Sequence, residues 1–277
     1  MAQSRKSILN QTTKYDFHIK KSLGQNFLSD SQAARKIAVV SSLSKNTTVI
    51  EVGPGTGALT DHLLELSKKV IAFEIDHDVI PILKENTEGI GELEVIEGDI
   101  LEQNLDFIND IEGEVVAVSN LPYYITSPII DLFLNKVPKI QRMYFMVQKE
   151  VADRITASIS TKDYNAFSIL VQYKANIKNV MNVKRTCFTP EPNVDSAVLE
   201  FVKVDREYKA SSFEFFKKVV ETSFRERRKT ILNNLSLFKP KDEMKEILEE
   251  LGINPALRPE NLSIDDYVRL SNYLGDE

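Results

Sequence analysis

The fold is decided by the stretch Val49-Ile-Glu-Val-Gly53-Pro-Gly55-Thr-Gly57-Ala-Leu-Thr60. A run of β-forming residues leads here into glycines at alternate positions, and an apolar pattern with helical spacing follows. Such glycines allow positive φ angles and let a ligand approach the backbone, while the start of the next helix presents unpaired N–H groups. The stretch therefore predicts a strand, a ligand-binding turn and a helix, although an ordinary βα turn has the same pattern when it stands alone.

Short β-rich runs alternate with helical patterns through the first two thirds of the chain. The runs that predict buried strands are Thr48–Val52, Val70–Ile75, Leu93–Glu97, Val115–Ser119 and Tyr144–Val147. Amphipathic stretches predict helices over Leu59–Leu66 and Val79–Asn86, and a third helix has Ser127 as its cap and Pro128 at its first position. This alternation is typical of a Rossmann-like α/β fold with a mostly parallel sheet.

The last third of the chain changes character. Two β-rich runs, Ser168–Val180 and Val194–Val204, predict an antiparallel hairpin at one edge of the sheet. Only helical patterns follow, over Phe213–Ser223, Arg228–Leu235, Asp242–Leu251 and Ile264–Leu274. We therefore expect an α/β domain over residues 1–203, with a basic N-terminal arm over 1–24, and a small all-helical domain over 204–277.

Composition narrows the range of functions. A single cysteine, Cys187, and a polar N-terminal stretch predict a cytoplasmic protein. No stretch approaches the roughly 20 apolar residues of a membrane span, so we expect no membrane partner. The net charge of −6 taken alone argues against a nucleic-acid partner, but basic residues cluster in Arg5–Lys21 and in Lys217–Lys229.

Two carboxylates follow predicted strands at the edge where the glycine turn lies. Glu74 ends the second strand and stands about 20 positions after the glycines, where an acidic residue can hold both hydroxyls of a ribose. Asp99 follows the third strand and suits an adenine amine, although capping its own loop is a competing role. Gly53, Gly55 and Ala58 also fit a dinucleotide fingerprint, so hydride transfer stays open at this point.

The fourth strand ends in Ser119-Asn120-Leu121-Pro122-Tyr123-Tyr124, the most specific motif of the chain. The N6 amine of adenine is a poor nucleophile because its lone pair is delocalised into the ring. Accepting both of its N–H bonds draws that lone pair out of conjugation, and the Asn120 side-chain oxygen and the Leu121 carbonyl are suited to this. Pro122 would fix the turn and Tyr123 would stack on an extruded base, whereas a simple strand-ending turn is the alternative.

Five stretches together resemble the ribosomal RNA adenine dimethyltransferases, and among them the bacterial small-subunit enzymes. They span most of the chain: Lys21–Leu28, Gly53–Gly57, Asn120–Tyr124, Phe188–Ser196 and Phe224–Leu235. The resemblance implies a class I methyltransferase sheet and S-adenosyl-L-methionine as cofactor. It also implies N6,N6-dimethylation of two adjacent adenosines near the 3′ end of small-subunit ribosomal RNA, with the assembling small ribosomal subunit as partner.

The resemblance also implies the residues of three sites. For the cofactor these are Gln25, Asn26, Leu28, Gly53, Gly55, Gly57, Glu74, Ile75, Asp99, Ile100 and Asn120, the first three closing over its methionine end. The catalytic residues are Asn120, Leu121, Pro122, Tyr123 and Phe188, with Phe188 as a second stacking wall. The RNA-binding residues are Arg225, Arg227, Arg228 and Lys229, for which a solvated helix face is the alternative.

Other functions stay open. A large-subunit RNA adenine methyltransferase of the erythromycin-resistance type shares the cofactor and the base chemistry, and a non-catalytic ribosome-assembly factor could use the same scaffold. A dehydrogenase is disfavoured, because nothing after the glycine turn offers a hydride-transfer site. We expect no metal ion, because the chain has no Cys–His cluster and its three histidines need no role. We also expect a monomer.

Overall fold

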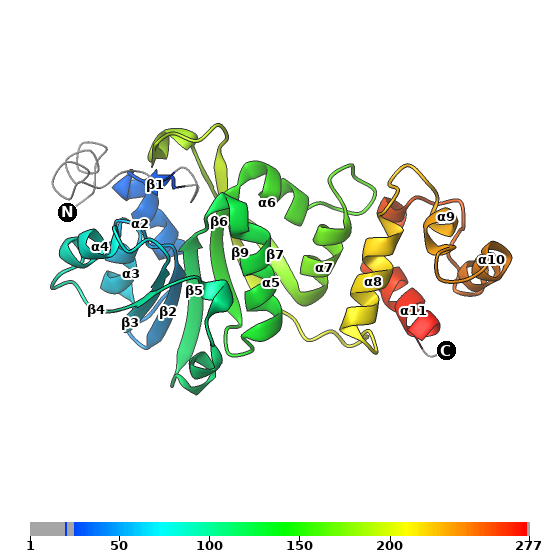
Figure 1. Ribbon diagram of the computed structural model, residues 1–277, viewed down its shortest axis with the longest axis horizontal. Coiled ribbons are helices and arrows are strands. Elements are labelled where there is room, and N and C mark those ends of the chain that lie inside the picture. Colours follow the sequence, from blue (N-terminus) through cyan, green and yellow to red (C-terminus); the bar gives the residue numbers. More distant parts are fainter. Residues whose placement is uncertain (1–19, 21–24, 276–277) are drawn as a thin grey trace. The chain divides into compact units, whose positions relative to one another are not determined.

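The computed structural model describes Lys20 and residues 25–275 of the chain (Figure 1). The chain divides into two compact units: the first runs to Ala152 and takes in Ile177–Lys203, and the second comprises Asp153–Asn176 and the chain from Val204 onward. The segment 153–176, predicted to belong to the α/β domain, is therefore part of the helical unit. The predicted basic arm, residues 1–24, lies outside the described residues except for Lys20.

Within the described residues, a seven-stranded sheet with the order β4-β3-β2-β5-β6-β9-β7 forms the centre of the first unit. Its strands are β2 (Thr47–Val52), β3 (Lys69–Glu74), β4 (Glu92–Glu97), β5 (Glu114–Asn120), β6 (Arg142–Gln148), β7 (Ala175–Val183) and β9 (Ser196–Lys203). The strands from β4 to β6 are parallel, and β9 runs antiparallel to β6. The predicted fold class, a mostly parallel Rossmann-like sheet with an antiparallel edge, is confirmed.

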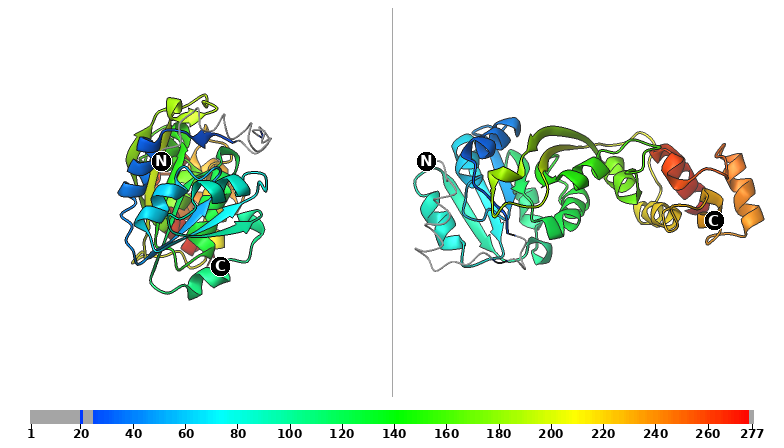
Figure 2. Two further views of the ribbon diagram at one scale, coloured as in Figure 1. Left: turned by 90° about the vertical axis from the view of Figure 1, so that its left-hand side faces the viewer. Right: turned by 90° about the horizontal axis from the view of Figure 1, so that it is seen from above.

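Helices cover both faces of this sheet. Tyr144 of β6 belongs to an apolar core that it shares with α2 (Ser31–Val40) and α3 (Thr60–Leu66). The next residue, Phe145, contacts Phe133 of α5 (Thr126–Lys136) with ring centroids 5.6 Å apart. Because neighbouring strand residues point to opposite faces, these contacts place α5 across the sheet from α2 and α3, and the turned views in Figure 2 show helices on either side of the strands.

The strand order reverses between β2 and β5. β2 pairs with β3 on one side and with β5 on the other, so the connections from β2 and β5 diverge at their carboxyl ends. Ligands of open α/β sheets bind in the crevice that such a reversal creates. Gly53 follows the last residue of β2 and Asn120 ends β5, so both predicted motifs lie at this point.

A small two-stranded sheet anchors the segment that precedes α2. β1 (Phe27–Leu28) pairs antiparallel with β8 (Phe188–Thr189), which places Leu28 opposite Phe188. The helix α2 was not predicted, although its cap residue was available in the sequence: the Asp30 side chain accepts hydrogen bonds from the main-chain N–H groups of Gln32 and Ala33.

The prediction of a strand over Ser168–Val180 is wrong for its first half. Residues Ala166–Lys174 form the helix α7, and β7 begins only at Ala175. The Asn165 side chain caps this helix and forms a capping box with Ser168. Ile169 and Tyr173, four residues apart on one helix face, are buried in the core of the second unit, and this packing outweighs their β propensity.

The remaining helices are α4 (Ile80–Asn86) and α6 (Lys149–Ile155), followed in the second unit by α8 (Phe213–Ser223), α9 (Ile231–Leu235), α10 (Lys241–Glu250) and α11 (Ile264–Gly275). Two predicted helix starts are corrected. α5 begins at Thr126 without a side-chain cap, so Ser127 does not cap it. α9 begins at Ile231 rather than Arg228, because Thr230 is its cap and accepts from the main-chain N–H of Asn233. Within the described residues, no helix combines the length and apolar character needed to cross a bilayer.

Candidate active site

A pocket opens at the carboxyl ends of β2 to β5, where the strand order reverses, and its space of about 950 Å³ is continuous with open solvent. Most of the residues predicted to bind the cofactor or to act in catalysis line it. These are Gln25, Asn26, Leu28, Gly53, Gly55, Glu74, Ile75, Asp99, Ile100, Asn120, Leu121, Pro122 and Tyr123. Residues from five separate segments of the first unit therefore meet at one site, and Gly57 and Phe188 are the two predicted residues that do not line it.

The glycine turn leaves no room for a side chain at Gly55, and its positive φ angle disfavours one at Gly53. Gly53 and Gly55 have φ angles of +66° and +55°. A Cβ atom on Gly55 would lie 2.9 Å from the ring of Phe27, and one on Gly53 would lie 3.4 Å from Cγ of Pro122. The glycines therefore let two other parts of the chain lie close to the turn. These are the N-terminal segment that contains Phe27, residues 25–28, and the Asn120–Tyr123 loop.

Gly57 serves packing rather than the pocket. Its φ angle is +91°, and a Cβ atom there would lie 2.8 Å from Cδ1 of Leu83 in α4. The third glycine of the motif thus allows α4 to approach the turn closely. Its predicted contact with the cofactor is not supported by the pocket lining.

Glu74 is a buried carboxylate at the end of β3, with 5% of its surface exposed. Its Oε2 accepts a hydrogen bond from the N–H of Gly55 at 3.0 Å, and its Oε1 accepts one from the N–H of Asp76 at 2.9 Å. Burial raises the pKa of the Glu74 carboxyl above its usual value, and the backbone hydrogen bonds oppose that rise. These bonds fix the carboxylate in the pocket wall next to the glycine turn.

Asp99 caps its own loop and also lies in the pocket wall, while its contact with an adenine amine stays a prediction. Its Oδ1 accepts from the N–H of Leu101 at 2.9 Å and so caps a short 3₁₀ helix, Ile100–Glu102. The same residue lines the pocket together with Ile75 and Ile100. Ile75 is 46% exposed, a large value for an apolar side chain, so it offers this part of the pocket a solvent-facing apolar wall.

Asn120 and Leu121 both line the pocket, and each carries a hydrogen-bond acceptor. The side-chain Nδ2 of Asn120 donates to the main-chain oxygen of Asn26 at 3.3 Å, and the Leu121 N–H donates to the Met146 oxygen at 3.2 Å. Within the described part of the chain, no group donates to Asn120 Oδ1 or to the Leu121 carbonyl oxygen. Asn120 Oδ1 and the Leu121 carbonyl oxygen are thus two acceptors on adjacent residues without a donor in the described part of the chain, and Leu121 as a whole is 1% exposed.

Two tyrosines follow these acceptors. The Tyr123 hydroxyl and Ser196 Oγ, which is buried at the start of β9, share a hydrogen bond of 2.9 Å that fixes the ring. Tyr124, which was not predicted as a site residue, also lines the pocket and is 51% exposed. An exposed aromatic side chain at a pocket mouth can stack on a ligand ring, so the repeated Tyr in the motif was an available signal.

Phe188, predicted as a second stacking wall, does not line the pocket. Its side chain is fully buried in the core beneath β1 and does not line the pocket. Its main chain pairs with that of Leu28, which does line the pocket. In this structure Phe188 supports the wall from behind, and the predicted stacking role is not reproduced.

Glu51 is a pocket residue that sequence reasoning missed. It is the last residue but one of β2, it is 1% exposed, and its Oε2 accepts from the Thr60 hydroxyl at 2.7 Å. Burial raises the pKa of the Glu51 carboxyl to about 8. A charged residue inside a buried parallel strand was the available signal.

The predicted RNA-binding residues lie in the second unit. Arg225, Arg227, Arg228 and Lys229 are all exposed in the turn between α8 and α9, and not on a regular helix face. Nη2 of Arg227 donates to the main-chain oxygen of Lys162 at 2.6 Å. The turn therefore displays four cations, one of which is tied to the segment that precedes α7.

A group of potential metal ligands lies beside the pocket. Asp76, His77 and Asp78 bring carboxylate and imidazole atoms within 4.8 Å of one another. The ammonium of Lys20 is hydrogen-bonded to both carboxylates at 2.6 Å, so a cation of the chain itself already occupies this position. The arrangement gives no reason to assign a metal ion.

The pocket at the reversal point, with its glycine turn, the buried Glu74 carboxylate and the Asn120–Tyr123 loop, is that of a Rossmann-like nucleotide-binding fold, and the comparisons with known proteins narrow this class to the methyltransferases. The model of the family described as ribosomal RNA adenine dimethylase matches residues 16–276. The chain therefore belongs to the ribosomal RNA adenine dimethylase family. It is 44% identical over 271 residues to the ribosomal RNA small subunit methyltransferase A of a Geobacillus strain, an alignment that covers 94% of this chain and 93% of the relative.

Solved structures show the same fold. A dimethyladenosine transferase from Plasmodium falciparum superposes with a TM-score of 0.76 at 28% identity, covering 90% of this chain and 98% of the other. The 23S rRNA methyltransferase ErmE superposes with a TM-score of 0.69 at 26% identity, covering 90% and 100%. The predicted family and fold are confirmed.

Proposed function

We propose that this chain transfers two methyl groups from S-adenosylmethionine to the N6 amine of adenosines in small-subunit ribosomal RNA. The observation that carries the chemistry is the pair of acceptors, Asn120 Oδ1 and the Leu121 carbonyl oxygen, on adjacent residues of one pocket wall. An exocyclic amine has two N–H bonds, and two acceptors on adjacent residues match them in number.

The pocket residues fit the adenosyl group of the cofactor. A close glycine cradle, a fixed carboxylate at Glu74 and apolar walls at Ile75 and Ile100 suit a phosphate-free nucleoside. Glu74 would hold the ribose hydroxyls and Asp99 would meet the adenine, while Gln25, Asn26 and Leu28 would cover the methionine end. When bound, S-adenosylmethionine supplies an electrophilic methyl group on a sulfonium.

The chain's own residues contribute position rather than strong acid–base chemistry. Asn120 and Leu121 accept the amine hydrogens, which favours the geometry in which the nitrogen lone pair is free to attack. Tyr123, fixed by Ser196, stacks on the extruded base, and Tyr124 adds aromatic surface at the pocket mouth. Proximity and alignment then supply most of the rate, without a covalent enzyme intermediate.

Two features support RNA, and small-subunit RNA in particular, as the substrate. The exposed turn with Arg225, Arg228 and Lys229 offers cations for phosphate contacts. Relatives named as small-subunit methyltransferases are 42–44% identical to this chain, whereas the 23S enzyme is 26% identical. The assembling small subunit as partner, a monomeric state, the absence of a metal ion and a cytoplasmic location stay predictions.

Two rival functions are weaker. A large-subunit methyltransferase would have the same pocket, so only the substrate distinguishes it. A non-catalytic assembly factor would have no need for the pair of acceptors that Asn120 and Leu121 present.

The decisive test uses radiolabelled S-adenosylmethionine and unmethylated small and large ribosomal subunits, followed by mapping of the labelled base. We expect label in small-subunit RNA, recovered as N6,N6-dimethyladenosine. Label confined to large-subunit RNA would establish the first rival, and no label in either subunit, with cofactor binding intact, would favour the second.

A further inference from the structure

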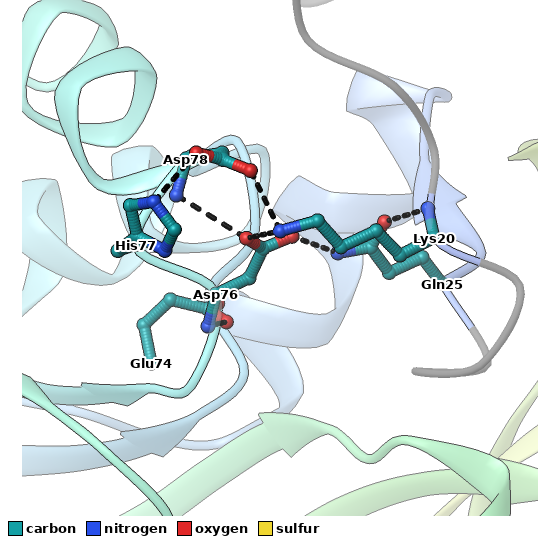
Figure 3. Close-up of polar contacts among 6 residues, drawn as sticks. All are labelled: Lys20, Gln25, Glu74, Asp76, His77 and Asp78. Carbon is teal, nitrogen blue, oxygen red and sulfur yellow. Dashed lines mark hydrogen bonds and ion pairs between the residues drawn. The ribbon is translucent and has the colours of Figure 1, made fainter.

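A buried carboxylate outside the predicted site lies two residues after Glu74. Asp76 is 1% exposed and its side-chain atoms are fully covered, yet it does not line the pocket. A buried carboxylate is costly unless hydrogen bonds and an opposite charge compensate it. In Figure 3 its two oxygens face Lys20 and Gln25, which come from the N-terminal segment.

The donors that bond to this carboxylate come from that N-terminal segment or from the loop of Asp76 itself. Asp76 Oδ1 accepts from Lys20 Nζ at 2.6 Å and from the N–H of Asp78 at 3.2 Å. Asp76 Oδ2 accepts from Gln25 Nε2 at 2.6 Å. The same Gln25 side chain accepts, through Oε1, from the N–H of Lys20 at 2.7 Å. Both ends of the Gln25 amide are therefore fixed, as Figure 3 shows.

Asp76 is also bonded to a second residue that lines the pocket, Glu74. Its main-chain N–H donates to Glu74 Oε1 at 2.9 Å, and Glu74 Oε2 accepts from Gly55. One residue thus holds Glu74 with its backbone and Gln25 with its side chain, and both of these residues line the pocket.

We propose that Asp76 is a positioning residue for the cofactor, holding Gln25 in the pocket wall with the help of the Lys20 ammonium. The inference deepens the proposed function, because it takes S-adenosylmethionine as the ligand of the pocket. Loss of the Asp76 carboxylate frees Gln25 and the segment that carries it, so the cofactor must order them when it binds and its affinity falls.

Asp78 provides a matched control. It also bonds to Lys20 Nζ at 2.6 Å, but its side chain is 43% exposed and it makes no contact with Gln25. Exposed ion pairs contribute little. The substitutions Asp76→Asn and Asp78→Asn remove the same charge two residues apart, and only the first disturbs Gln25.

The test measures the dissociation constant of S-adenosylmethionine by calorimetry, without RNA, together with the melting temperature of each ligand-free protein. An asparagine at position 76 has one acceptor oxygen for the three donors that the carboxylate now serves, so Asp76→Asn should weaken binding at least about tenfold, as expected when a hydrogen bond to a charged group is lost. Lys20→Met, a change at a partly exposed side chain, should weaken it in the same direction. Asp78→Asn should stay within about twofold.

A double-mutant cycle separates positioning from general stability. In the double variant Asp76→Asn/Gln25→Glu, the new amide can donate to the new carboxylate, so part of the lost affinity should return relative to Asp76→Asn alone. If Asp76 were merely structural, the losses of cofactor affinity in the two single variants should add up in the double variant.

Three results would overturn the inference: an unchanged dissociation constant for both Asp76→Asn and Lys20→Met, equal weakening by Asp76→Asn and Asp78→Asn, or strict additivity in the cycle. If the wild-type protein itself fails to bind S-adenosylmethionine, the proposed function fails instead. The two failures are therefore distinguishable.

Discussion

Asn120 is held by a single side-chain hydrogen bond, to the main-chain oxygen of Asn26, and its Oδ1 is left as an acceptor at the pocket. Asn120→Ala removes that acceptor and leaves the Glu74 wall intact. We expect cofactor binding to be retained and methyl transfer to slow by at least about 100-fold, the usual cost of losing a well-placed polar contact in catalysis. Single-turnover kinetics with ribosomal RNA measure the rate of methyl transfer, and calorimetry measures cofactor binding. A variant near the wild-type rate would show that another group accepts the amine hydrogens.

Glu51 makes the folding stability of the protein depend on pH. Burial raises the pKa of its carboxyl to about 8, well above the value in an unfolded chain, so the folded state binds the extra proton between these two values. Folding stability therefore falls as pH rises from about 5 to about 8, by roughly 1.4 kcal/mol for each unit of pKa difference.

Glu51→Gln keeps the hydrogen bond to Thr60 and removes the titration. The variant should lose less stability than the wild type between pH 5 and pH 8, as measured by urea unfolding at each pH. Parallel pH profiles for the two proteins would mean that the Glu51 carboxyl does not titrate in this range.

Site residues could be predicted from the sequence where their position depends only on the strand that carries them. Glu74 and Asn120 stand at strand ends, and the alternation of strands and helices fixes the edge at which such ends meet. Phe188 could not be placed in this way, because its burial depends on the pairing of β8 with β1, two segments about 160 residues apart in sequence. Asp76 was missed for the same reason, since its partner Gln25 comes from the N-terminal segment.

At the scale of elements, the turn after β2 depends on close contact with β1. Gly55 has a φ angle of +55° and lies under the ring of Phe27, whereas Gly89 has a φ angle of +74° and nothing within 4 Å of where a Cβ would be. Both Gly55→Ala and Gly89→Ala should cost about 1–2 kcal/mol of folding free energy from the positive φ alone.

Gly55→Ala should cost more than Gly89→Ala, because Phe27 must also move. It should also weaken binding of S-adenosylmethionine, whereas Gly89→Ala should not. Chemical denaturation and calorimetry of the two variants make the comparison. Equal losses of stability with unchanged cofactor affinity in both would contradict the role assigned to the turn.

Some boundaries of helices and strands could be predicted from sequence patterns, and others could not. Strands buried on both faces give short apolar runs that were located to within a residue or two, as for β2 and β5. Residues Ser168–Lys174 have β-forming side chains as well, but they pack as a helix against Phe216 and its neighbours in the second unit. A single-sequence pattern contains no information about that partner.

At the scale of the whole molecule, the two units have separate apolar cores and separate predicted tasks. The pocket lies entirely within the first unit, and the basic turn lies in the second. Replacing Arg225, Arg227 and Arg228 with Glu should weaken RNA binding by at least about tenfold, with a smaller salt dependence, because phosphate contacts release counterions. Cofactor affinity should stay unchanged.

Arg227 also bonds to the main chain of Lys162, so the triple variant could lose stability as well as charge. The variant Arg225→Glu/Arg228→Glu leaves that bond in place and controls for it. Filter binding of small-subunit RNA at several salt concentrations measures the effect. RNA affinity equal to that of the wild type in both variants would exclude this turn as the RNA contact.

In the proposed function, Asn120 and Leu121 accept hydrogen bonds from the amine of an extruded adenine inside the pocket at the reversal point of the sheet. A crystal structure with S-adenosylhomocysteine and a short RNA containing the target adenosine tests it directly. We expect the adenine N6 within hydrogen-bonding distance of both Asn120 Oδ1 and the Leu121 carbonyl oxygen, facing the cofactor sulfur. An adenine N6 bonded elsewhere, or a cofactor bound outside the Gly53–Glu74 pocket, would contradict it.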